Sequence, residues 1–90
     1  MVTVTVKKGV HAQEQSAEQI WRVECDDMDV ARRLTMMMAE NEKFRRVTPI
    51  TGGAVTFAAP RTKKGFKPYL KAIEKVAVQA NIGRKVELIY

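Results

Sequence analysis

Cysteine, histidine and aromatic residues are scarce in this 90-residue chain. A single cysteine, Cys25, excludes an internal disulfide, and with a single histidine it leaves no Cys/His set for a metal site. No run approaches the roughly 18 consecutive apolar residues of a membrane-spanning helix. The alternating Val and Thr at the N-terminus also differ from a secretory signal. These features predict a cytosolic protein without a metal or another cofactor.

Recognisable catalytic motifs are lacking as well. The sequence has no glycine-rich phosphate loop, no serine nucleophile motif and no paired carboxylates at a catalytic spacing. The acidic run from Asp26 to Asp29 lacks the alternating ligands and the glycine of a calcium loop, and helix capping accounts for it. Cys25 and His11 are the candidates for nucleophilic chemistry, but Cys25 is expected to point into the core. We therefore expect a binding protein and not an enzyme.

What the chain does have is a strong and uneven positive charge. Its formal net charge is +6, and its apolar (46%) and charged (29%) contents are typical of one globular domain spanning residues 1–90. Residues 1–42 carry five basic and eight acidic side chains, a net of −3, whereas residues 43–90 carry eleven and two, a net of +9. This asymmetry predicts a positive face that attracts an anionic partner.

The N-terminal half predicts two strands followed by a helix. Valines at positions 2, 4 and 6 predict a half-buried strand. Residues 20–25 also alternate, with Trp21, Val23 and Cys25 on one face, although a helix through this segment stays an alternative. Residues 9–18 between them predict a loop or a short helical turn. A helix then follows the Asp26–Asp27 cap, with an apolar stripe formed by Val30, Ala31, Leu34, Met37 and Met38.

The C-terminal half predicts a strand pair, a helix and a last strand. Residues 44–50 are extended, with Pro49 marking an edge, and a turn at 51–53 leads into a strand at 54–59. Residues 60–65 predict a basic loop, and Pro68 suits the first turn of a helix that stops at 81–83. The closing strand spans 84–90.

This order of elements predicts an α+β fold. From the second strand on, the pattern is β-α-β-β-α-β, the split arrangement of ferredoxin-like folds. We therefore expect an antiparallel sheet with two helices on one face and the other face open. The N-terminal strand should extend this sheet as a hairpin with residues 20–25.

The strongest functional signal is a basic segment between residues 61 and 75. Five basic residues fall within eleven positions without one acid: Arg61, Lys63, Lys64, Lys67 and Lys71. Lys67, Lys71 and Lys75 recur every four residues, which places them about 6 Å apart along a helix. A phosphate backbone complements such a row, although a solvated helix face partly neutralised by Glu74 is the alternative.

Other residues could widen or modify this basic surface. Lys43, Arg45 and Arg46 form a second cluster, and Arg84 and Lys85 form a third. Arg46 and Lys85 could join Arg22, Thr48 and Thr56 on the open face of the sheet. Phe66 could stack on a base or, alternatively, anchor the start of the helix.

One strand is partly similar to the signature of RNA-recognition motifs. In residues 50–57, Gly53 and Val55-Thr56-Phe57 match that signature, whereas Gly52 and Ala54 replace its two base-stacking aromatic residues. Without these rings, binding to RNA or DNA should rely on phosphates. It should then be weakly selective for sequence and sensitive to salt.

The sequence is therefore compatible with two classes of partner. Nucleic acid is the first hypothesis. The second is an acidic surface of a partner protein, bound by an adaptor or inhibitor such as small viral and phage proteins provide. Met36 supports the second hypothesis, because three consecutive methionines cannot all face one core and Met36 should project outward among charged residues.

Overall fold

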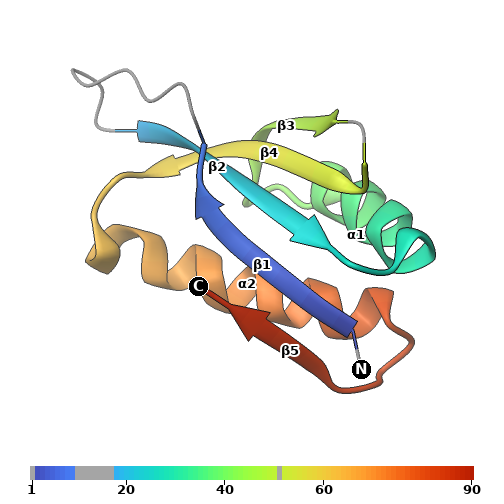
Figure 1. Cartoon of the computed structure of the whole chain (residues 1–90). Helices are drawn as coiled ribbons and strands as arrows, with labels where there is room; N and C mark the ends of the chain where they lie inside the picture. The colour runs from blue at the N-terminus through green and yellow to red at the C-terminus, as the bar shows by residue number, and fades with distance from the viewer. Residues whose placement is uncertain (1, 10–17, 51) are drawn as a thin grey trace.

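Two helices cover one face of a five-stranded sheet and leave the other face open (Figure 1). The computed structural model describes residues 2–9, 18–50 and 52–90, and these ranges form a small α+β domain. Its elements are β1 (Val2–Lys8), β2 (Glu18–Cys25), α1 (Met28–Glu40), β3 (Arg45–Ile50), β4 (Ala54–Pro60), α2 (Lys63–Ala80) and β5 (Val86–Ile89). The segment at 20–25 is thus a strand, and the helical alternative is wrong.

The sheet is mixed and not antiparallel as predicted. Its strand order is β3-β4-β2-β1-β5, in which β5 runs parallel to β1 while all other neighbours are antiparallel. The predicted hairpin between β1 and β2 is confirmed, but β1 lies inside the sheet and not at its edge.

Local chain connection explains this order. One edge of β2 pairs with β4, and only the other edge remains. A hairpin closes a much shorter loop than the connection through α2, so β1 can take this edge at the lower entropic cost. The strand β5 then docks on β1, where its direction makes the pair parallel.

The core lies between the sheet and the two helices, as strand alternation predicts. Trp21, Val23 and Phe57 are buried and face the helices. The Trp21 ring stacks on Phe66 of α2 with the ring centroids 3.8 Å apart, and its Nε1–H donates to the carbonyl oxygen of Pro60 at 3.2 Å. This stack ties the start of α2 to the middle of the sheet.

The second helix begins earlier than Pro68 predicts. Thr62 is its N-cap, with Thr62 Oγ1 accepting a hydrogen bond from the Gly65 amide at 3.1 Å, and Pro68 lies inside the helix. The capping threonine was overlooked because proline is common at the first helical position. Lys63 and Lys64, predicted in a loop, therefore lie in the first turn of α2.

The first helix agrees with its predicted pattern. Asp27 is the N-cap and accepts hydrogen bonds from the amides of Asp29 and Val30. Met38 is buried and Met37 is half-buried against the core, whereas Met36 is 64% exposed. Among the described residues, neither helix combines the length and apolar character needed to cross a bilayer.

Parts of two predicted segments lie outside the described residues. These are residues 10–17 of the predicted loop, which include His11, and Thr51 of the predicted turn. The described part of that turn fits the prediction, because Gly52 and Gly53 both have positive φ angles, of 90° and 78°.

Candidate functional site: two basic surfaces

Five lysines of α2 form the first basic surface. The side chains of this lysine face are exposed, on the side of the helix away from the core: Lys63, Lys64, Lys67, Lys71 and Lys75. Within the described ranges, no carboxylate lies at ion-pairing distance from any of them. Their charge is therefore available to a partner.

The earlier start of α2 lengthens the predicted lysine row by one turn. Lys63 now precedes Lys67, Lys71 and Lys75 at the same four-residue spacing. Each step advances about 6 Å along the axis and drifts about 40° around it, so the row follows a gently spiralling line. A flexible polyanion can follow such a line with successive charges.

Three of the predicted contact sites do not join the lysine face, and one of them, Arg45 with Arg46, lies on the open face of the sheet. Phe66 is fully buried beneath Trp21 and has no surface for a base, so the anchoring alternative describes it correctly. Arg84 and Lys85 precede β5 and line a hollow of about 420 Å³ together with the acidic residues Asp26 and Asp27. Arg61 is half-buried immediately before the N-cap of α2.

The second basic surface is a groove on the open face of the sheet. This sheet groove has a volume of about 580 Å³ and is lined by Lys7, Lys8, Gly9, Ile20, Arg22, Arg46, Thr48, Ile50 and Thr56. Four of these residues are basic and none is acidic. The predicted grouping of Arg22, Arg46, Thr48 and Thr56 is confirmed, whereas Lys85 lies elsewhere.

Sequence reasoning missed Lys7 and Lys8 as part of this surface. The register places Lys7 opposite Arg22, Arg22 opposite Thr56, and Thr56 opposite Thr48. These residues thus form one line across four strands. Alternation along β1 indicated that Lys7 faces away from the valines, but the neighbouring strand could not be known.

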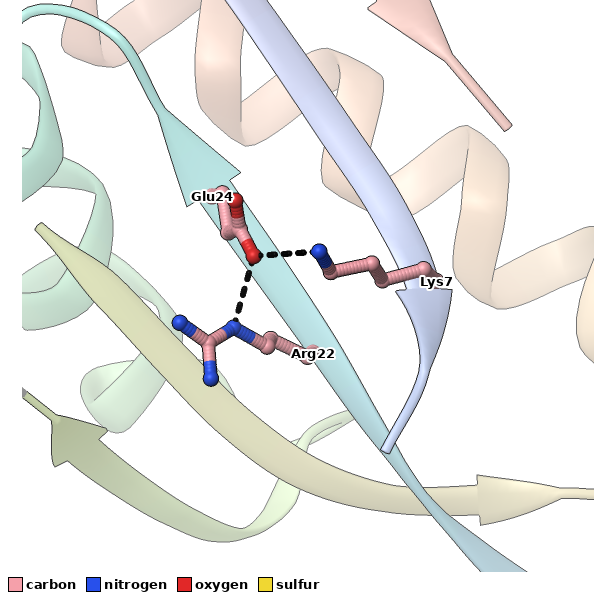
Figure 2. Close-up of polar contacts among 3 residues, drawn as sticks. All are labelled: Lys7, Arg22 and Glu24. Carbon is pink, nitrogen blue, oxygen red and sulfur yellow. Dashed lines mark hydrogen bonds and ion pairs between the residues drawn. The ribbon is translucent and has the colours of Figure 1, made fainter. Parts of the chain in front are cut away.

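Glu24 holds two of the basic side chains of the groove in place. Its Oε1 accepts from Lys7 Nζ at 2.8 Å and from Arg22 Nε at 2.7 Å (Figure 2). The hydrogen bond from Lys7 is the main influence that lowers the pKa of the Glu24 carboxyl, and the positive charges of Lys7 and Arg22 add to it. Glu24 therefore remains ionised at neutral pH, and the terminal nitrogens of Arg22 point away from it.

A β-bulge directs both arginines of β3 to the open face. Arg45 pairs with Ala58 and Thr48 with Thr56, so β3 advances three residues while β4 advances two. Arg46 lies in this bulge with φ at 57°, a left-handed conformation that is unfavourable for a non-glycine residue. Arg46 consequently lines the groove, while Val47 packs against the core. Arg45 is exposed and lies 3.9 Å from Glu18.

An apolar hollow lies between α1 and the turn that joins β3 to β4. Met28 and Met36 are 50% and 64% exposed, and both line this hollow of about 410 Å³ with Pro49 and Ile50. The predicted exposure of Met36 is confirmed. Met28, the second exposed methionine of this hollow, was not predicted, because it lies in the acidic run that was interpreted as a helix cap.

In the described part of the chain, no group of three or more His, Cys, Asp or Glu side chains is arranged to hold a metal ion. Burial raises the pKa of the Cys25 thiol, which keeps it protonated.

Comparison with models of protein families, with characterised proteins and with solved structures gave no match. The function is therefore inferred from the surfaces themselves.

Proposed function

We propose that this protein binds the phosphate backbone of nucleic acid through its lysine face, with little selectivity for sequence. One observation carries this proposal: five exposed lysines line one helix, and within the described residues no carboxylate forms an ion pair with them. Neutralising phosphates with such side chains releases condensed counterions, which favours binding. Arg45 and Arg46, on the sheet, could meet a strand that bends around the domain.

Low sequence selectivity is expected because the lysine face offers charges for phosphates and the three largest buried rings cannot reach a base. Trp21 and Phe57 face the helices, and Phe66 lies beneath Trp21. Lysines that contact phosphates set the orientation of a protein on a duplex but carry no sequence information directly. Binding at the lysine face should therefore depend on charge density more than on base sequence.

Salt dependence tests this proposal directly. Between 50 and 200 mM salt, affinity for a duplex should fall roughly 10- to 1000-fold, because a handful of phosphate contacts release counterions. Fluorescence anisotropy of a labelled duplex at several salt concentrations measures the slope. A slope near zero would show that the lysine face makes no phosphate contacts.

A protein partner is the second candidate function, and the exposed pair Met28 and Met36 favours it. Methionine adapts to varied contact surfaces, and here two exposed methionines share one hollow. Met36→Asp should reduce recovery of such a partner in a pull-down without lowering the melting temperature, because position 36 is exposed. Unchanged recovery would exclude Met36 from the interface. Arg32→Ala, which changes the charge at the edge of the same hollow by the same amount, serves as the control for charge.

We further propose that the fold is a variant of the ferredoxin-like class. In that class, the strand after the second helix lies beside the first strand of the pattern. Omitting β1 from this sheet leaves β5, β2, β4 and β3 in that order, which supports the relationship. The inserted β1 and the parallel pair that it forms with β5 are the points of difference.

A further inference from the structure

We infer that the sheet groove is a second binding site, which accepts one or two unpaired nucleotides of a single strand. This inference goes beyond phosphate binding at the lysine face, because the groove lies on the opposite side of the sheet from the helices. Its volume of about 580 Å³ falls in the range of small-ligand sites. Four basic residues line it and, among the described residues, no acidic one does. Glu24 offsets part of the charge of Lys7 and Arg22, whereas Lys8 and Arg46 add positive charge that favours an anionic ligand.

The path of the ligand follows from the strand register. Lys7, Arg22, Thr56 and Thr48 lie in line across β1, β2, β4 and β3. A chain laid along this line crosses the strands and meets a cation at the β1 end. Arg46 supplies a further positive charge at the β3 end. Phosphates can thus be contacted at both ends of the groove, with room for a base between them.

The lining between these cations suits a flat, weakly polar ring. Ile20 and Ile50 provide apolar surface, and a guanidinium plane can stack on a base while it also pairs with phosphate. Thr56 Oγ1 donates to the Thr48 carbonyl at 3.4 Å, and Thr48 Oγ1 donates to the Arg46 carbonyl at 3.2 Å. Each hydroxyl therefore retains oxygen lone pairs that accept hydrogen bonds from a base.

The basic side chains are held in place before a ligand arrives. Glu24 fixes Lys7 and Arg22 at 2.8 and 2.7 Å, and Figure 2 shows the Arg22 terminal nitrogens directed away from Glu24. The bulge at Arg46, with φ of 57°, maintains an unfavourable backbone conformation that places a second guanidinium in the same groove. Such ordering lowers the entropy lost on binding.

Other anions fit this groove less well. A free inorganic anion leaves the apolar lining without a contact. A duplex keeps its bases stacked inside and presents a convex backbone, so it offers no ring to a concave site. An unpaired nucleotide combines a charged phosphate with an exposed ring face. An acidic peptide is the competing ligand class, and the experiment below separates the two.

The test compares single strands that differ only in their bases. Anisotropy is measured with labelled oligothymidylate of about ten nucleotides and with an abasic strand of equal length and charge. Wild type should bind the strand with bases about 10-fold more tightly. The groove variant Ile20→Thr/Arg46→Gly should lose most of this preference. The lysine-face variant Lys67→Ala/Lys71→Ala should weaken both strands by the same factor and keep the preference.

These variants separate the two proposals. If the lysine-face variant binds as wild type does while the base preference remains, only the proposal for the lysine face fails. Equal affinity of wild type for both strands overturns the inference about the groove, whatever the lysine-face result. In the lysine-face variant, poly-glutamate that displaces oligothymidylate as efficiently as unlabelled oligothymidylate would identify an acidic peptide as the ligand of the groove and also overturn the inference.

A second measurement needs no variant and therefore does not depend on folding of the mutants. A 5′-phosphorylated thymidine dinucleotide is titrated into methyl-labelled wild-type protein. The Ile20 and Ile50 methyl resonances should shift upfield as a base ring covers them, while Ile73 in the core should not move. If both groove methyl groups remain unshifted at saturation, no base lies in the groove.

Discussion

Replacing Lys63, Lys64, Lys67 and Lys71 by alanine should abolish duplex binding at about 150 mM salt while the fold remains intact. All four side chains are exposed and, in the described part of the chain, none is ion-paired. Each lysine removed from a phosphate should reduce the slope of log affinity against log salt by about 0.9. Removing four lysines would thus eliminate most of the electrostatic contribution to the free energy of binding.

The fold should tolerate these four substitutions. Alanine has the highest helix propensity, and loss of like charges on one helix face relieves repulsion. Circular dichroism and thermal melting check this point, and anisotropy with a labelled duplex measures binding. The variant with arginine at the same four positions keeps the charge and should bind as wild type does. If the alanine variant retains wild-type affinity, the duplex binds to another surface and the proposal for the lysine face is wrong.

Trp21→Ala should lower the free energy of unfolding by about 3–5 kcal/mol, enough to unfold much of the population of a marginally stable domain. Trp21 is 2% exposed, and its ring stacks on Phe66 of α2 at 3.8 Å. Removing it leaves a cavity between β2 and α2 and deprives the Pro60 carbonyl of its hydrogen-bond donor.

Urea denaturation followed by circular dichroism measures this loss, since Trp21 is the only tryptophan and its fluorescence disappears with it. Trp21→Phe keeps a ring in the stack and should cost less than the alanine variant. Tyr90→Ala, at a ring that is 52% exposed beside the same stack, should have a small effect. A midpoint for Trp21→Ala equal to that of wild type would contradict the importance assigned to this stack.

Features of the fold that depend on neighbouring residues could be predicted, whereas features that depend on distant segments could not. Alternation in β1, β2 and β4 identified the core face, because the side-chain period of a strand is a property of the chain itself. The Asp27 cap and the apolar stripe of α1 were predictable for the same reason. The predicted start of α2 was wrong, because Thr62 and Pro68 both suit a helix start. The hydrogen bond at the Thr62 cap and the packing of Phe66 on Trp21 favour the earlier one.

The two candidate sites differ in predictability for the same reason. The lysine face could be predicted from spacing alone, since a helix brings every fourth residue to one side. The sheet groove could be predicted only in part, because Lys7 and Arg46 are far apart in the sequence and belong to strands that do not pair with each other. Their meeting depends on strand order and on the bulge at Arg46.

By itself, the sequence determined the alternating strands, the amphipathic helices and an excess of positive charge in the C-terminal half. Each of these follows from neighbouring residues and the geometry of a single element. Only the tertiary structure decided that β1 would separate β2 from β5, that Phe66 would be buried, and that cations from β1, β2 and β3 would surround one groove. These outcomes depend on competition between distant segments for the same strand edge and the same core space, which no local pattern encodes.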